Sequence, residues 1–379
     1  MTLFLFSFLL IYGSVHLYTF LKAKAALEFS AAPGSLLALL MLVMGLAPII
    51  VHALERAGLE LPARVMAYIG YIWMGVLFLF FSYSLAADFY RLLIYLGGSI
   101  FSRDLSTLRL SPGYAFFLPL GLSLVTSVYG YFEARDIRTE RWTLKSPKIP
   151  QEVGRLKIVH ISDVHLGLIV REERLKKILR KVSAENPDIL VSTGDLVDGE
   201  VCRLNGLEDL LKEIRPRYGK FAVTGNHEFI AGFENAKCFT ENAGFTLLRG
   251  EGLTVQGILN IAGVDDPTGK RYGLVKDISE KALLSNLPQE KFTLFLKHRP
   301  LVDKDAKGLF DLQLSGHIHK GQIFPFSIIT WLYYPVNSGK MNLTDNAFMY
   351  VSRGAGTWGP PIRFLSPPEV AVIELVHGS

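Results

Sequence analysis

The chain has 379 residues, of which 50% are hydrophobic and 20% are charged, and its formal net charge is +5. Disordered chains are poor in apolar residues and rich in net charge, so this composition excludes a disordered protein. The basic residues are mixed with acidic ones, so we expect no nucleic-acid partner. Two cysteines cannot form a disulfide framework.

The charged residues are unevenly distributed along the chain. Only 12 of them lie in residues 1–132, against 63 in residues 133–379. A charged fraction near one quarter is typical of a globular domain, whereas the first region is too apolar to be one. We therefore predict a four-helix transmembrane region (1–132), a juxtamembrane linker (133–154) and a globular domain (155–379).

The first region contains four stretches without charged residues, each long enough to cross about 30 Å of hydrocarbon as a helix. They are Thr2–Leu21, Phe29–Leu54, Val65–Ala87 and Leu110–Phe132. Helices satisfy their own backbone polar groups, which lipid requires. We expect a multi-pass protein of the cell membrane. A cleaved signal peptide is the alternative for the first stretch, but the basic residues that begin such peptides are missing.

The orientation of these spans follows from the basic residues at their ends. Seven lysines and arginines would lie on the side of the globular domain, and five on the other side. The positive-inside rule then favours a cytoplasmic globular domain. Lys22 and Lys24, which follow an uncharged N-terminus, argue the opposite way.

The second region alternates short apolar runs with helical patterns. Each run is rich in branched residues and ends in polar ones, which is typical of a buried strand. The runs are 157–160, 188–192, 221–224, 292–296 and 311–315, and the helical patterns are 171–185, 204–214 and 277–286. Strands alternating with helices predict an α/β domain in which helices cover a sheet. Side chains that follow the carboxyl ends of such strands converge in space.

Polar clusters follow these runs, and they have the composition of a metal site. Five of the nine histidines lie in them, together with Asp163, Asp195 and Asn226. The histidines are His165, His227, His298, His317 and His319. Imidazole with carboxylate and amide oxygens suits Mn, Fe, Zn or Co. Any one of these short motifs is more often a coincidence than a site, but five in order at strand ends are not.

The order of the clusters resembles that of the calcineurin-like metallophosphoesterases. It reads Asp163-Val-His165, Gly194-Asp195-Leu-Val-Asp198, Gly225-Asn226-His227-Glu228, His298 and Gly316-His317-Ile-His319. The glycine-rich tail around Arg353-Gly354 looks like that of the membrane-anchored bacterial branch. The resemblance implies a two-sheet sandwich flanked by helices.

The resemblance also implies a role for each ligand residue, and the chemistry of two metal ions suggests roles for its neighbours. Asp163, His165 and His319 would hold one metal ion, Asn226, His298 and His317 a second, and Asp195 would bridge the two. A hydroxide between the ions would attack phosphorus, with His227 as general acid. Asp198 or Glu228 would orient a neighbouring group, although Asp198 also suits a turn. Arg353 would contact the substrate phosphate, or would be a surface arginine.

We therefore expect a membrane-anchored phosphoesterase that cleaves a phosphodiester or pyrophosphate, with membrane lipids as neighbours and a lipid-linked substrate. Residues 324–334 (FPFSIITWLYY) are apolar and aromatic, and they form either a core strand or a rim that faces the membrane. The alternative function is a non-catalytic membrane sensor or scaffold on the same fold. The sequence leaves the oligomeric state open.

Overall fold

The computed structural model describes residues 2–199, 204, 206–275, 277–334, 336–344 and 346–378. Two compact units divide the chain. One comprises Met1–Phe132 with Gly359–Phe364, and the other comprises Glu133–Trp358 with Leu365–Ser379. We call them the helical unit and the catalytic unit.

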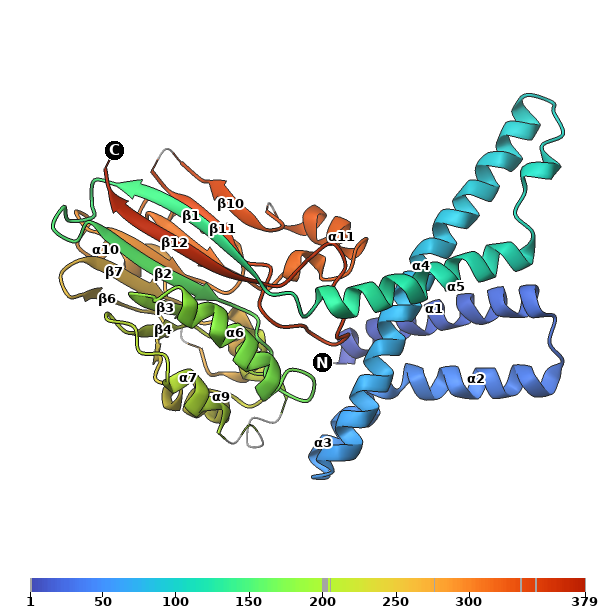
Figure 1. Ribbon diagram of the computed structural model, residues 1–379, viewed down its shortest axis with the longest axis horizontal. Helices are drawn as coiled ribbons and strands as arrows, with labels where there is room; N and C mark the ends of the chain where they lie inside the picture. The colour runs from blue at the N-terminus through green and yellow to red at the C-terminus, as the bar shows by residue number, and fades with distance from the viewer. Residues whose placement is uncertain are drawn as a thin grey trace. The chain divides into compact units, whose positions relative to one another are not determined.

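The helical unit is built from five α-helices (Figure 1). They are α1 (Thr2–Leu27), α2 (Ala31–Gly45), α3 (Ala47–Arg56), α4 (Glu60–Ile100) and α5 (Pro112–Glu133), with a short 3-10 turn at Ser106–Leu108. Among the described residues, three helices are long and apolar enough to cross a membrane, and α2 with α3 would make a fourth as one span bent by 51°. The bend falls at the start of α3, where Pro48 is the second residue and cannot donate a hydrogen bond to the preceding turn.

Several polar groups inside the helical unit are paired. His16 Nδ1 lies 2.8 Å from the Tyr12 carbonyl, and Trp73 donates to His16 Nε2 at 3.0 Å. Tyr18 donates to Asp88 at 2.6 Å, and Lys22 forms an ion pair with the same carboxylate. These pairs satisfy polar groups that hydrocarbon would not.

The catalytic unit contains two mixed six-stranded sheets, as expected for the two-sheet sandwich. The first sheet has the order β1 (Arg138–Ser146), β12 (Glu369–His377), β2 (Arg155–Ile161), β3 (Ile189–Ser192), β4 (Lys220–Ala222), β5 (Thr246–Leu247). The second has the order β10 (Gly339–Asn342), β11 (Phe348–Val351), β9 (Leu312–Ser315), β8 (Phe292–Leu296), β7 (Leu259–Gly263), β6 (Glu251–Val255). The fold class predicted from the sequence is confirmed.

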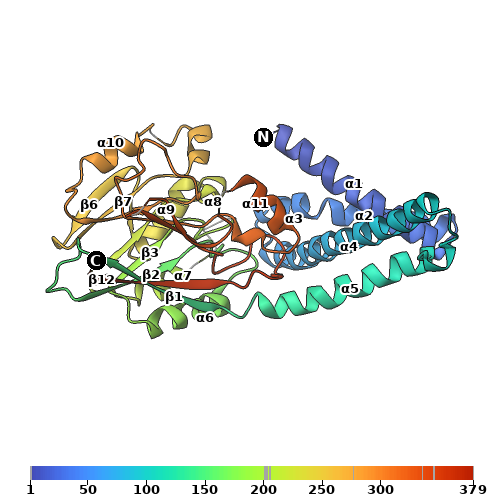
Figure 2. The ribbon, with the colours of Figure 1, turned by 90° about the horizontal axis from the view of Figure 1, so that it is seen from above.

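Helices flank this sandwich. In Figure 1, α6 (Glu172–Ala184), α7 (Leu207–Lys212) and α9 (Phe233–Asn242) lie along the β2–β4 part of the first sheet. In Figure 2, α10 (Glu280–Ser285) lies beside β6 and β7. Two short helices, α8 (Asn226–Ile230) and α11 (Phe326–Tyr333), lie in the connections that follow β4 and β9, and 3-10 turns span Pro267–Tyr272 and His319–Gly321. Apolar residues of both sheets form one core, and the helices bury a second against the first sheet.

Two segments differ from the sequence prediction. The stretch treated as a linker contains β1, which pairs in parallel with β12 from the far end of the chain. The prolines and charged residues of this stretch give no strand pattern, although β1 is an edge strand whose partner lies more than 200 residues away. Residues 326–333 form a helix, α11, and not a core strand.

Candidate metal centre

The candidate ligands follow five strands whose carboxyl ends share one edge of the sandwich. β2, β3 and β4 are parallel neighbours in the first sheet, and β8 and β9 are parallel neighbours in the second. Their strand ends therefore bring together residues that are up to 156 positions apart, from Asp163 to His319. This is where parallel α/β sheets place their sites.

The structure brings these side chains into two neighbouring groups, and the Asp195 carboxylate lies close to both. Asp163, His165 and His319 have ligand atoms within 4.8 Å of one another, and so have Asp195, His298 and His317. Asp195 Oδ2 lies 3.2 Å from His298 Nε2 and 3.8 Å from His165 Nε2, so it reaches both groups.

The fourth candidate ligand of the second set lies beside the other three. Asn226 Oδ1 lies 3.3 Å from His298 Nε2. His317 Nδ1 lies 3.1 Å from the same nitrogen. Nitrogen and oxygen donors that converge in this way fit a divalent or transition-metal ion.

The backbone is strained at these residues. Asp163, His165, Asp195, His317 and His319 have φ between +48° and +75°, a region that residues other than glycine rarely occupy. Strain of this kind persists only where the surrounding structure enforces it, and it gathers at functional sites. Here it turns successive side chains toward the shared edge.

Two glycines make room for the ligands. A Cβ atom at Gly225 would lie 2.2 Å from Asp195 Oδ1, and one at Gly316 would lie 2.2 Å from Asp163 Oδ2. Any other residue would displace a candidate ligand.

The buried carboxylates of the cluster favour positive charge beside them. Burial raises the pKa of Asp163 to about 6, despite the nearby His298. Burial alone lowers the pKa of His298, but the Asp195 and Asp163 carboxylates outweigh it and raise the pKa to about 10. A proton on His298 thus offsets the charge of the neighbouring carboxylates at neutral pH. Cations satisfy the same buried carboxylates, so the donor set fits metal ions.

Glu228 holds the loops that carry the ligands. Its buried carboxylate accepts hydrogen bonds from the backbone N–H groups of Asp195 (3.0 Å), Leu196 (2.7 Å) and Gly225 (2.6 Å). Burial, with the nearby Asp195 carboxylate, raises the pKa of Glu228 to about 7. Glu228 therefore joins the loop after β3 to the loop after β4.

His227 is oriented by a second carboxylate. Its Nδ1 lies 2.9 Å from Asp198 Oδ1, and its backbone N–H donates to Asp195 at 2.8 Å. Burial alone lowers the pKa of His227, but Asp198 and Asp195 raise it to about 9. His227 also lies close enough to His165 and Asp195 to act as a ligand itself. Asp198 thus orients His227. From the sequence, this role was one of two alternatives for Asp198, the other being that of a turn residue.

Arg353 is held by carboxylates of the first sheet. Its guanidinium pairs with Glu140 on β1 and Glu369 on β12, both at 2.5 Å. A contact between Arg353 and the substrate phosphate stays a prediction from the sequence.

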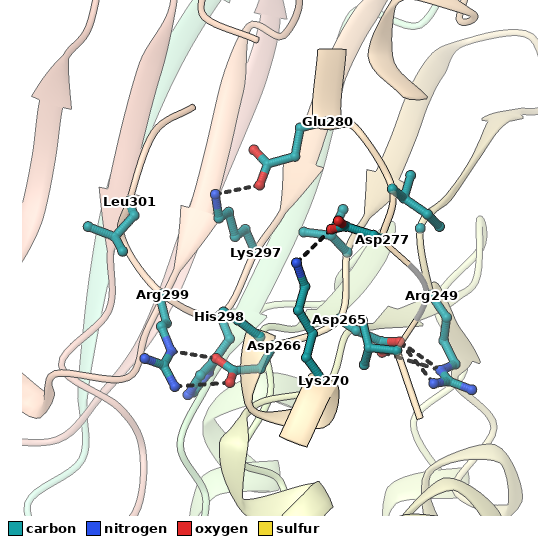
Figure 3. A pocket seen from close by; sticks show the side chains of 15 residues that line it. Arg249, Asp265, Asp266, Lys270, Asp277, Glu280, Lys297, His298, Arg299 and Leu301 are labelled. Atoms are coloured by element: carbon teal, nitrogen blue, oxygen red, sulfur yellow. Dashed lines mark hydrogen bonds and ion pairs between the residues drawn. The ribbon is translucent and has the colours of Figure 1, made fainter. Parts of the chain in front are cut away.

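A charged pocket of about 180 Å³ adjoins the cluster at His298 (Figure 3). Four ion pairs line it: Arg249–Asp265, Arg299–Asp266, Lys270–Asp277 and Lys297–Glu280. Asp266 also accepts from the Thr268 N–H at 2.8 Å and so caps the 3-10 turn at Pro267–Tyr272. We call this cavity the charged pocket.

Sequence reasoning overlooked two neighbours of the ligands. Arg299 follows His298 directly and makes two hydrogen bonds to Asp266, at 2.7 and 3.0 Å. The Trp358 ring lies 5.9 Å from that of His227. The adjacency of Arg299 to a candidate ligand was a usable signal, whereas the position of Trp358 depends on a loop that no local pattern fixes.

Comparison with known proteins agrees with this geometry. Residues 156–321 match the calcineurin-like phosphoesterase family. The chain is 39% identical to an uncharacterized metallophosphoesterase of Aquifex aeolicus, over 67% of this chain and 97% of the relative. It is 32% identical to a transmembrane protein with a metallophosphoesterase domain from Danio rerio, over 68% of this chain and 62% of that protein. The NAD nucleotidase of Haemophilus influenzae aligns with a TM-score of 0.37 and 17% identity, over 53% of this chain and 51% of the nucleotidase.

Proposed function

The chain belongs to the calcineurin-like metallophosphoesterases and is a metal-dependent phosphoester hydrolase associated with the membrane, and from this premise we propose that it works with two metal ions. The observation that carries the proposal is Asp195, which reaches both ligand groups. Asp163, His165 and His319 would hold one ion, and Asn226, His298 and His317 the other. The donor set favours Mn, Fe, Zn or Co.

Bound ions of this kind supply Lewis acidity and lower the pKa of bound water, so that hydroxide is available at neutral pH. The chain's own residues supply position and protons. Glu228 fixes the two loops that carry Asp195 and Asn226. The strained ligand backbones hold the donors in place before substrate arrives.

His227 is the proposed general acid for the leaving oxygen. Asp198 fixes its Nδ1, which leaves Nε2 as the nitrogen that can give a proton. A pKa raised to about 9 keeps the ring protonated at neutral pH, the form that an acid requires. If His227 were a metal ligand instead, its loss would release an ion, so metal content separates the two roles.

We further propose that the substrate is a lipid-linked phosphodiester or pyrophosphate. The helical unit offers up to four spans, and one would suffice as an anchor. The basic residues at the span ends favour several passes with the catalytic unit on the cytoplasmic face.

The test uses the purified full-length chain, stripped with a chelator and reloaded with Mn, Fe, Zn or Co. A panel would contain a soluble phosphodiester, a lipid-linked pyrophosphate and its deacylated analogue. We expect hydrolysis to return with two equivalents of metal per chain and to favour the lipid-linked ester. Full turnover with one equivalent would refute the two-metal proposal. Metal binding without turnover of any ester would favour the non-catalytic sensor.

A further inference from the structure

Helix α11 presents an apolar surface to solvent. None of its residues is buried. Ile328 and Ile329 are at least half exposed, and Trp331, Leu332 and Tyr333 are 63%, 73% and 75% exposed. Residues 324–334 contain no charged side chain. A soluble surface rarely gathers so many apolar side chains without a partner that covers them.

Polar contacts tie the helix to the segment that follows it in the catalytic unit. Thr330 donates to the Asn337 side-chain oxygen at 2.6 Å, and Asn337 donates back to the Ser327 carbonyl at 2.7 Å. The exposure of the apolar side chains therefore belongs to an anchored helix.

The same helix borders the candidate metal centre. Tyr334, which caps α11, packs its ring 5.9 Å from that of the ligand His317. Upstream, Gln322 exchanges two hydrogen bonds of 2.9 Å with the backbone of Trp358, whose half-exposed ring faces His227. A molecule lying on α11 would thus be next to both the ligands and the proposed acid.

We propose that α11 is an interfacial helix that lies in the headgroup layer of the phospholipid bilayer and guides lipid-linked esters to the metal centre. Tryptophan and tyrosine concentrate at that depth, and a short apolar helix binds there through its exposed face. The guidance of substrate rests on the proposed phosphoesterase function, whereas the contact with lipid does not.

The connection to the helical unit supports this choice of partner. α5 ends at Glu133 and β1 begins at Arg138, so four residues separate them. At about 3.5 Å per residue the chain cannot carry the catalytic unit far from the end of that helix. Gly359–Phe364 also belongs to the helical unit, where the Arg363 N–H donates to the Gly130 carbonyl at 2.9 Å. The connection therefore keeps the catalytic unit close to any bilayer that α5 crosses.

The contact is tested on the full-length chain in phospholipid nanodiscs. A single cysteine replaces Leu332 in a Cys202→Ser/Cys238→Ser background and carries the fluorophore NBD. The matched control carries NBD at Leu301, a leucine of the catalytic unit that is 41% exposed. Lipids spin-labelled near the headgroup should quench NBD at 332 strongly and NBD at 301 weakly. Equally weak quenching at both positions would overturn the proposal.

The guidance of substrate is tested by kinetics. Leu332→Glu should lower kcat/KM for the lipid-linked ester by about tenfold or more and leave that for a soluble ester unchanged. Leu301→Glu should change neither. An equal loss for both esters would overturn the guiding role, and Ile329→Glu repeats the test at a second exposed position. If no ester is hydrolysed by any variant, the phosphoesterase proposal fails, while quenching still decides the contact with lipid.

Discussion

The metal centre and the charged pocket lie side by side but handle charge in opposite ways. In the pocket, Arg249, Lys270, Lys297 and Arg299 each pair with a carboxylate, so the protein neutralises itself. In the centre, Asp163 and Asp195 accept hydrogen bonds from Ser162 and from backbone N–H groups. Within the described part of the chain, their charged neighbours at ion-pair distance are histidines.

This difference separates structural from functional charge. His298 and Arg299 are neighbours in sequence, yet Arg299 turns to Asp266 and His298 to Asp195. The ion pairs of the charged pocket have a structural role. The buried carboxylates of the metal centre lack a lysine or arginine partner among the described residues and are available to bind a metal ion. The predictions below test this division.

The largest effect is expected at the shared carboxylate. Asp195→Asn removes a ligand from both groups, so kcat should fall by about 10³-fold or more. The matched change in the charged pocket, Asp265→Asn, should leave kcat per folded molecule within a few-fold of the wild type. Turnover rates with saturating metal decide this. Near-wild-type, metal-dependent turnover in Asp195→Asn would show that the charges of the metal centre are not functionally different from those of the charged pocket.

A smaller loss is expected at the proposed acid. His227→Ala should retain both ions and slow hydrolysis by roughly 10²–10⁴-fold. The loss should shrink for nitrophenyl esters, whose leaving groups need little protonation. Asp198→Asn should cost about tenfold, because it loosens the ring without removing it. Equal losses for good and poor leaving groups would exclude His227 as the acid.

Substitutions in the charged pocket should lower the stability of the protein and leave its metal affinity unchanged. Asp266→Ala removes the partner of Arg299 and the cap at Thr268, so the free energy of unfolding should fall by about 3 kcal/mol. Lys270→Met breaks an exposed pair and should leave the melting temperature unchanged. Thermal unfolding and metal titration measure the two effects. A large loss of metal affinity in Asp266→Ala would place the pocket within the centre.

Much of the candidate metal centre was predictable, because each candidate ligand directly follows an apolar strand. Parallel strands then bring these ends together without further information. The contact between His227 and Asp198 was not predictable in this way, since two separate loops set it. β1 was missed because an edge strand with a distant partner leaves a weak local pattern. The ion pairs of Arg353 with Glu140 and Glu369 were not predictable either, because they depend on the position of β1.

α11 shows a different limit of sequence reasoning. A continuous apolar run fits a buried strand or an exposed helix equally well, because periodicity does not distinguish them. Only the tertiary structure shows that Trp331, Leu332 and Tyr333 remain on the surface. The membrane-facing rim nevertheless stood as one of the two alternatives for this segment.

The smallest predicted effect concerns His160, a buried histidine that is not among the candidate ligands. His160 Nε2 lies 2.8 Å from Thr193 Oγ1, Thr193 donates to Ser162 at 2.8 Å, and Ser162 donates to the ligand Asp163 at 2.5 Å. No carboxylate offsets the burial of His160, which lowers its pKa to about 3. His298, beside the carboxylates, shifts in the opposite direction.

The pH dependence of stability follows from this lowered pKa. Between pH 6.5 and about 3 the unfolded chain binds a proton at His160 and the folded chain does not, so stability falls as pH falls through this window. At pH 5 the loss is about 2 kcal/mol relative to pH 7.5. His160→Gln cannot titrate, so its unfolding free energy should fall by about 2 kcal/mol less than that of the wild type over the same interval. Other buried histidines contribute equally to both proteins and cancel in this difference. Identical pH dependence in the two proteins would mean that His160 is not held neutral, and that burial alone does not separate it from the histidines of the metal centre.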